Sequence, residues 1–184
     1  MIIPSAEFIH RPSGERRGLS GPPLSVRVMT NWINTVSRDH VERGVRGRFT
    51  QANHGKPHAL RRMARGDWVI FYSPRISHPD GPPLKAFTAI GQVVDDEPYQ
   101  AEMSPDIQPW RRNVDFLECV ETPILPLIEH LHFVENKQHW GYRFRFGVFS
   151  VDDHDLELIR TAMTRPLESV GPPTVSGDSG GVPD

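Results

Sequence analysis

The amino-acid sequence predicts a small α+β fold in which five or more strands, joined by short helices, form a barrel-like sheet. Three observations lead to this prediction. Apolar runs of strand length, alternating or continuous, recur along the middle of the chain. The helical patterns between them are short and interrupted by glycine or proline. At 184 residues the chain suits one domain with tails and is long enough to bury a core.

Both ends of the chain differ in composition from its middle. Residues 1–25 carry Pro, Gly, Ser and Arg with little apolar pattern, and residues 166–184 form a Pro/Gly/Ser tail. Such segments bury too little apolar surface to offset their ordering entropy. We therefore expect a disordered N-terminal extension over residues 1–25, a folded domain over 26–165 and a disordered tail over 166–184. Met29, near the start of the folded domain, is a candidate alternative start.

The first strand is predicted over residues 26–36, where every second side chain falls on one face. A short helix follows, with Ser37 as its N-cap. Its apolar stripe consists of Val41, Val45 and Phe49, spaced at i, i+4 and i+8. Residues 57–66 predict a second short helix, with proline at its start and glycine after it.

The remaining elements are mostly strands. Residues 67–74 form a nearly continuous apolar run, which is typical of a strand buried on both faces. Further strands are predicted over residues 87–94, 113–121 and 143–151, and in the last of these Phe144, Phe146 and Val148 alternate with polar or small residues. A helix capped by Asp152 or Asp153 closes the domain, with Leu156, Ile159 and Met163 on its buried side.

Charge is nearly balanced overall but unevenly distributed. The formal net charge is −2, yet the segment from residue 38 to residue 75 contains nine Lys and Arg residues and only three acids. Residues 95–106 hold five acids and no base. The basic stretch predicts either a surface for a polyanion or a solvated arginine-rich face.

The chemical inventory favours a binding protein over an enzyme. The sequence has no P-loop, no GxGxxG and no GxSxG motif. Cys119 lies within a predicted strand and is best explained as a core residue. Pro57 and Gly55 break the helix that would align His54 with His58 as metal ligands. We expect no catalytic residue, no metal and no cofactor.

The compartment is suggested by two further features. A single cysteine excludes an internal disulfide framework and fits a reducing compartment. No apolar run reaches the roughly 20 residues of a membrane span, and the N-terminus lacks the apolar region of a signal peptide. We expect a cytoplasmic protein without membrane partners.

Two loops and an unusual decapeptide are candidate binding elements. Trp110 precedes two arginines, and Trp140 also stands outside any apolar run. Tryptophans beside arginines can stack on a base and pair its phosphate, or each can simply seal one end of the barrel. The stretch GRFTQANHGK, residues 47–56, has neither helix nor strand period. It fits either a turn that satisfies its own backbone or the rim of a site for a small planar ligand.

Four segments, taken together, identify a family resemblance. NWINTVSRDHVERGVRGRFTQANHGKPHALRRMARGDWVIFYSPR, KAFTAIGQVVDDEPYQ, PWRRNVDFLE and WGYRFRFGVFSV resemble the EVE domain over about residues 29–163. EVE domains belong to the PUA-like superfamily of five- or six-stranded pseudo-barrels. They are similar to YTH domains, which hold N6-methyladenine in an aromatic cage. The resemblance implies a mostly antiparallel PUA-like pseudo-barrel and a non-enzymatic reader of modified, methylated bases in DNA or RNA.

The resemblance also implies a site. Phe49 would form one aromatic wall, where a YTH domain has Trp, and Tyr72, Trp110 or Trp140 the second. Asn34, Thr50 and Gln51 would hydrogen-bond the edge of a flipped base. The full expected ligand site comprises Trp32, Asn34, Ser37, Phe49, Thr50, Gln51, Asn53, His54, Tyr72, Ser73, Trp110 and Trp140. The expected contacts to the nucleic-acid backbone are Arg46, Arg48, Lys56, Arg61, Arg62, Arg75, Arg111 and Arg112.

Two other functions compete with this hypothesis. Related PUA-like domains of the ASCH type include hydrolases of nucleosides or RNA, which would need a base or nucleophile such as Lys56, His54 or Tyr72. A module that docks a protein through its basic surface is the third possibility. The expected partners of the reader are modified DNA or RNA, with effector proteins encoded elsewhere.

Overall fold

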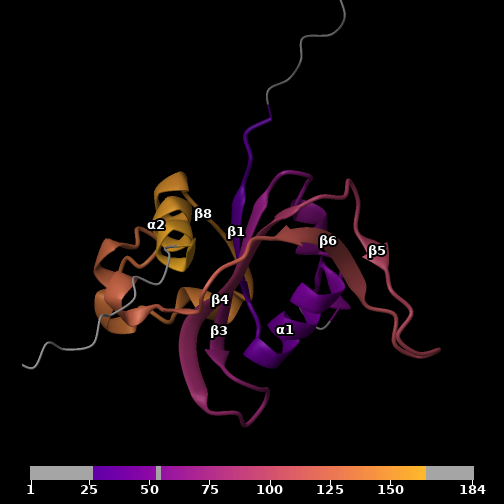
Figure 1. Ribbon diagram of the computed structural model, residues 1–184, viewed down its shortest axis with the longest axis horizontal. Coiled ribbons are helices and arrows are strands. Elements are labelled where there is room, and N and C mark those ends of the chain that lie inside the picture. The colour runs from indigo at the N-terminus through magenta and orange to yellow at the C-terminus, as the bar shows by residue number, and fades with distance from the viewer. Residues whose placement is uncertain (1–26, 53–54, 165–184) are drawn as a thin grey trace, which may run out of the picture.

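The computed structural model describes residues 27–52 and 55–164 (Figure 1). The extension and tail expected to be disordered, residues 1–25 and 166–184, lie outside the described residues, as do Asn53 and His54. No helix in the described part is long and apolar enough to cross a bilayer.

One curled, mixed sheet organises the described chain. Its main strands run in the order β2-β6-β4-β3-β1-β8, with β5 paired to β6 and β7 to β4. The strands are β1 (Asn31–Thr35), β2 (Phe49–Thr50), β3 (Trp68–Arg75), β4 (Pro83–Val93), β5 (Tyr99–Gln100), β6 (Trp110–Phe116), β7 (Thr122–Pro123) and β8 (Val148–Val151). Among the described strands, only β1 and β3 pair in parallel. The predicted α+β class, with a curled, mostly antiparallel sheet and short flanking helices, is confirmed.

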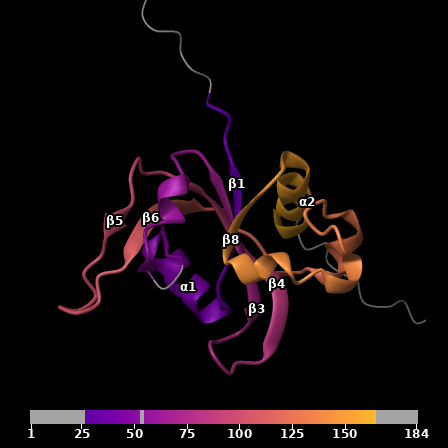
Figure 2. The same cartoon turned by 180° about the vertical axis from the view of Figure 1, so that it is seen from behind.

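Helices cover the sheet from two sides. They are α1 (Arg38–Gly47), α2 (Asp153–Thr164) and the 3-10 helices η2 (Leu60–Arg62), η3 (Leu125–His130), η4 (Lys137–His139) and η5 (Arg143–Phe146). Because β1 and β3 are parallel, the chain between them must cross the sheet, and α1, β2 and η2 make this crossing. Figures 1 and 2 show α1 on one side of the central strands and α2 on the other.

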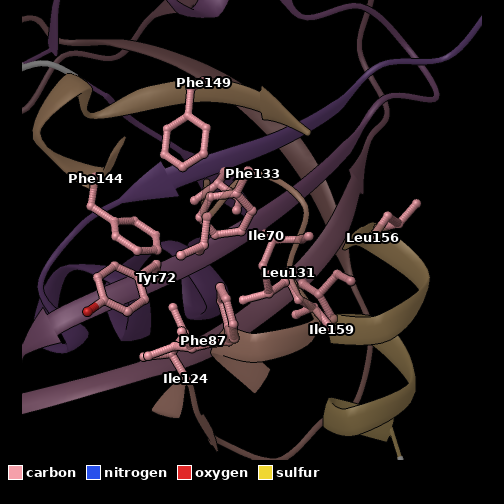
Figure 3. Close-up of a cluster of buried hydrophobic side chains, with 14 of the residues drawn as sticks. Ile70, Tyr72, Phe87, Ile124, Leu131, Phe133, Phe144, Phe149, Leu156 and Ile159 are labelled. Carbon is pink, nitrogen blue, oxygen red and sulfur yellow. The ribbon is translucent and has the colours of Figure 1, made fainter. Parts of the chain in front are cut away.

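Strand β3 separates two hydrophobic cores, because successive side chains of a strand point to opposite faces. Val69 and Phe71 pack with Trp32, Val41 and Leu60 on the α1 side. Ile70 and Tyr72 pack on the α2 side, in the aromatic cluster of Figure 3 with Phe87, Phe133, Phe144, Phe149, Leu156 and Ile159. The prediction that this strand is buried on both faces is therefore confirmed, as is the buried side of the closing helix.

Four predicted elements differ from the structure. The strand predicted over residues 113–121 is β6, Trp110–Phe116, so Cys119 lies beyond its end and is only partly buried. The first strand spans only Asn31–Thr35, and the predicted helix over residues 57–66 is reduced to the single 3-10 turn η2. The stretch RFRF is not a strand but the 3-10 helix η5, and β8 begins only after Gly147, whose φ is 74°. Phenylalanines two apart lie on different faces of a 3-10 turn, so Phe144 is buried while Phe146 is 58% exposed.

Candidate functional site

The end of α1 turns directly into β2, which places the decapeptide loop beside β6. Arg48 takes the left-handed conformation after the helix, with φ at 55°, and Phe49 and Thr50 then pair with Asn113 and Arg112. A side chain at Gly47 would overlap the ring of Phe49. Phe49 thus belongs to a strand folded back over the helix end, and the predicted helical stripe through Val45 and Phe49 is wrong.

Asn34, Thr50 and Gln51, which the family resemblance implies as contacts to a base, lie together in the structure. The Asn34 amide donates to Thr50 Oγ1 at 3.1 Å and to the Gln51 carbonyl at 3.2 Å. Asn34 and Thr50 are each only 1% exposed. These hydrogen bonds join β1 to the decapeptide loop, so the two side chains hold the loop in place rather than presenting their polar atoms to solvent.

Phe49 is covered by an arginine rather than by a second aromatic wall. The guanidinium of Arg111 lies 3.7 Å from the centre of the Phe49 ring, and its Nε donates to Gln51 Oε1 at 3.4 Å. Phe49 pairs with Asn113, so their side chains lie on the same face of the sheet, as does that of Arg111 two residues away. Trp110 is adjacent to Arg111 in the strand. Trp110 therefore points to the opposite face of β6, toward the α1-side core against which it packs. Within residues 27–52 and 55–164, no ring–ring contact involves Phe49.

Two further arginines lie over tryptophans at η2. Arg61 lies 5.4 Å from the centre of the Trp110 ring, and Arg62 lies 4.8 Å from that of Trp32. Trp32 itself is 4% exposed, and its indole N–H donates to Asp67 Oδ2 at 2.9 Å. Trp32 is thus a core residue whose outer ring face carries a cation, and it does not form an open ligand wall.

Asp67 and Asp95 organise this region, although the sequence indicated only their charge. Asp67 accepts hydrogen bonds from Trp32, from the backbone N–H groups of Thr30 and Ala64, and from Arg27. Burial alone would raise the pKa of Asp67, but these hydrogen bonds outweigh it and hold the pKa below its usual value. The sequence places Asp67 between Gly66 and Trp68, just before a buried strand. This position could have indicated an aspartate that accepts buried hydrogen bonds.

Arg112 corrects the predicted set of backbone contacts. It is fully buried, and its guanidinium donates to Asp95 Oδ1 at 2.6 Å and to the Asp95, Met63 and Leu60 carbonyls at 2.7, 2.6 and 3.2 Å. These acceptors occupy the fork of the guanidinium from inside the protein. Arg112, on β6, joins the segment between β4 and β5 to η2 and its neighbourhood, and it is unavailable to a phosphate.

Acids neutralise part of the basic stretch. The ion pairs are Arg38 with Glu42 and Glu121, Arg43 with Asp39, Arg48 with Asp115 and Arg65 with Asp96. Arg75 donates to the carbonyls of Pro79 and Gly81. Five of the eight side chains expected to contact the nucleic-acid backbone make no ion pair within the described ranges and donate no hydrogen bond to a backbone carbonyl: Arg46, Lys56, Arg61, Arg62 and Arg111. Within this expected set, the charge available to a ligand lies around η2, on β6 and at the end of α1.

The other expected ligand residues lie elsewhere. Tyr72 is 2% exposed on the α2 side and stacks on Phe144 at 3.7 Å, and Trp140 packs against the same cluster. Ser73 is buried, with its hydroxyl 2.8 Å from that of Thr88. The Ser37 hydroxyl donates to Asp39 Oδ1 at 2.6 Å and makes no cap to the helix backbone. The predicted cage of Phe49 with Tyr72, Trp110 or Trp140 is not assembled.

Tyr72, Cys119 and the cluster of His132, His154 and Asp155 are poorly suited to catalysis or metal binding. Burial raises the pKa of the Tyr72 hydroxyl and of the Cys119 thiol, which disfavours their reactive anions. His132, His154 and Asp155 lie close enough to share an ion. However, the two imidazoles are stacked at 3.9 Å and 7°, so their in-plane lone pairs run parallel and do not converge. Both Asp155 oxygens also accept backbone N–H groups.

Comparisons with known proteins place this geometry in context. The sequence profile described as "EVE domain" matches residues 30–162. A UPF0310 protein of Mycolicibacterium vanbaalenii is 75% identical over 142 residues, which make up 77% of this chain and 98% of that protein. A UPF0310 protein of Mesorhizobium japonicum is 45% identical over 139 residues, covering 73% of this chain and 92% of the relative.

Solved structures resemble the chain more distantly. A hypothetical protein from Leishmania major aligns with a TM-score of 0.45 and 16% identity, covering 72% of this chain and 93% of its own. Human THYN1, solved in complex with DNA containing 5-methylcytosine, aligns with a TM-score of 0.43 and 13% identity, covering 74% of this chain and 99% of its own.

Proposed function

Since the chain belongs to the EVE domain family, we propose that it is a non-enzymatic module that binds nucleic acid and reads a modified, methylated base in DNA or RNA. One observation carries the proposal: three arginines without an acidic partner in the described chain are held over aromatic rings around η2 and β6. These are Arg61 over Trp110, Arg62 over Trp32 and Arg111 over Phe49. We call them the stacked arginines.

Stacking on an aromatic ring orients an arginine side chain for binding a phosphate group. A guanidinium that lies on a ring keeps its N–H groups in the plane of the fork, where they can bond two phosphate oxygens. The ring also restricts the side chain, so less rotamer entropy is lost on binding. Arg46 and Lys56 add charge close by in the sequence, at the end of α1 and before η2. The stacked arginines are therefore suited to follow a nucleic-acid backbone.

The cluster of Asn34, Thr50 and Gln51 supports this surface indirectly. Its hydrogen bonds fix the strand that carries Phe49, and Gln51 contacts Arg111. We propose that these residues position Arg111 and Phe49 rather than read the edge of a base. The burial of Tyr72 argues against one of the three groups, with Lys56 and His54, that a hydrolase of the ASCH type could use as a base or nucleophile.

A salt titration with matched charge reversals tests the proposal. Arg61→Glu and Arg46→Glu should each weaken binding of a short oligonucleotide and reduce the slope of log affinity against log salt by about one. Arg160→Glu is the control, because Arg160 lies on α2 and pairs with Glu157 at 2.8 Å, away from the stacked arginines. Equal affinities for all three variants and the parent would contradict the proposed surface. Release of a nucleoside or cleaved strand during the titration would instead indicate an enzyme.

A further inference from the structure

A large cleft lies at the other end of the sheet, beyond β8. Its volume is about 860 Å³, within the range of roughly 300–1,000 Å³ that small-molecule sites occupy. Its walls come from η4, η5, β8, the segment 133–136 and, across the sheet edge, Arg62 of η2. None of the described residues of the decapeptide loop lines it. The cleft therefore includes Trp140 and Arg62 from the predicted residues but lies apart from Phe49, Asn34 and Thr50.

Aromatic side chains dominate the walls of the cleft. Phe133 and Phe149 form its buried floor, and Trp140 is half-buried. Tyr142 and Phe146 are each 58% exposed and meet edge to face, with ring centres 5.5 Å apart. Two exposed aromatic rings held at right angles at the mouth of a cavity are costly in water and are typical of a binding site. Such walls suit a flat, aromatic ligand.

The edge of β8 adds hydrogen-bonding groups to the same cleft. β8 is the terminal strand of the described sheet. Thr35 N donates to Gly147 O at 2.7 Å, and the next pair along the two strands is Asn34–Val148. Bonded and non-bonded pairs alternate in an antiparallel ladder, so the N–H and C=O groups of Val148 and Ser150 point away from β1. Both residues line the cleft. The strand thus offers peptide donors and acceptors at the spacing of a strand edge.

Two cations stand at the cleft and connect it to the stacked arginines. Arg143 lies 5.1 Å from the centre of the Phe149 ring, and Arg62 lines the cleft from η2. Glu135 is the one acid of the lining, so these three side chains leave an excess of positive charge. Arg62 is the neighbour of Arg61 in η2, so a strand bound along the stacked arginines would pass the mouth of the cleft.

We propose that this cleft binds one nucleobase between its aromatic side chains, with the attached phosphate on Arg62. The inference rests on the proposed function and gives its base-reading step a place. The ligand is either a base extruded from a strand or a free nucleotide, which share this chemistry. A peptide added to β8 fits less well, because the strand has only four residues and the cleft is compact and aromatic.

Calorimetry with mononucleotides tests the pocket itself. The full-length chain is titrated with the 5′-monophosphates of adenosine, cytidine and their base-methylated forms. Phe146→Ala and Tyr142→Ala should each weaken the binding by about tenfold, the size of a lost base–aromatic stack. Both rings are largely exposed, so folding should persist, and Leu125→Ala is the matched control, because Leu125 is 57% exposed and lies outside the cleft. Arg62→Gln should bring the affinity for a nucleotide down to that for its nucleoside.

Oligonucleotides distinguish the two sources of the base. A short single strand with one methylated base is compared with the same strand abasic at that position. If the base comes from a strand, the parent prefers the intact strand and Phe146→Ala removes this preference. If the ligand is a free nucleotide, both strands bind alike while the monophosphates retain their sensitivity to Phe146→Ala.

The outcomes separate this inference from the proposed function. If Phe146→Ala and Tyr142→Ala bind every probe as tightly as the parent, the proposed base site in the cleft is wrong. This holds even where binding of a strand still depends on salt and on Arg61. The proposed base site is also wrong if the parent binds neither mononucleotides nor oligonucleotides, even where the edge of β8 binds a peptide. Sensitivity of mononucleotide binding to Phe146→Ala without any strand binding supports the cleft and contradicts the nucleic-acid surface.

Discussion

At the level of single residues, the arginines of this chain perform two opposite tasks. Arg112 is fully buried and turns every part of its guanidinium toward Asp95 and carbonyl oxygens. Arg111, its neighbour on the other face of β6, lies over Phe49 without an acidic partner in the described chain. Of two adjacent arginines on one strand, Arg112 therefore stabilises the fold and Arg111 lies on the surface. A count of charges along the sequence cannot distinguish these roles.

Arg112→Met should strongly destabilise the domain. The substitution leaves the Asp95 carboxylate without its buried cation and three carbonyls without this donor, and breaking a buried pair costs about 3–5 kcal/mol. The free energy of unfolding from urea denaturation measures the effect. Arg46→Met, an exposed arginine on α1, should change it by less than about 0.5 kcal/mol. Similar stabilities for the two variants would show that Arg112 is not the internal tie proposed here.

Phe49→Ala should affect binding more than folding. The ring is half-buried on the outer face of β2, and its loss frees Arg111 to move. Oligonucleotide affinity should fall about tenfold for modified and unmodified strands alike, because a stacking platform is sequence-tolerant. Arg111→Gln is the matched variant, and its effect should not add to that of Phe49→Ala if the two act as one unit. A Phe49→Ala protein that is unfolded would instead identify Phe49 as a core residue.

Asp67 should make stability depend on acid. Its pKa is lower in the folded chain than in the unfolded one, so its stabilising contribution is complete above the unfolded value of about 4 and is lost as pH falls toward the folded value. Asp67→Asn should be less stable than the parent at neutral pH, and the difference should shrink below about pH 4. Urea denaturation at several pH values measures this. A constant difference across the acid range would contradict the assigned pKa direction.

At the level of elements, periodicity predicted well wherever one face or both faces of a regular element are buried. β3 and α2 were identified by their residues because burial alone determines their patterns. RFRF was misassigned because an alternating pattern also fits a 3-10 turn, and the positive φ of Gly147 that separates the two was invisible in the sequence. The cleft was missed for the same reason, since Tyr142 and Phe146 reach its mouth only through that turn.

The glycines of α1 have a tertiary role that propensity obscures. A Cβ at Gly44 would lie 2.7 Å from the Phe49 carbonyl oxygen, so β2 can approach the helix only over a glycine. Gly44→Ala should therefore lower the free energy of unfolding, although alanine favours an isolated helix by about 1 kcal/mol. Val45→Ala, at a 40% exposed position of the same helix, is the control. A more stable Gly44→Ala protein would show that β2 moves away at no cost.

At the level of the whole molecule, the parallel pair β1–β3 determines where function can lie. The crossing chain supplies Arg61 and Arg62 on the α1 side, while the return through η3, η4 and η5 builds the aromatic cleft at the β8 edge. The sequence identified the basic stretch correctly, because charge is local. It could not show that Asp96 and Asp115 neutralise Arg65 and Arg48, because those partners are distant along the chain.

The domain should fold and bind without its ends. We propose that residues 26–165 are sufficient, since residues between 27 and 164 form two hydrophobic cores and the Arg27–Asp67 pair. Deleting residues 1–25 and 166–184 should therefore leave the melting temperature within about 2–4 °C of the parent, the shift that roughly 1 kcal/mol produces in a chain of this size. Oligonucleotide affinity measured at the same salt should also be unchanged. A larger fall in melting temperature would show that an end packs on the domain. Weaker binding at unchanged stability would show that the basic residues before position 25 extend the surface of the stacked arginines.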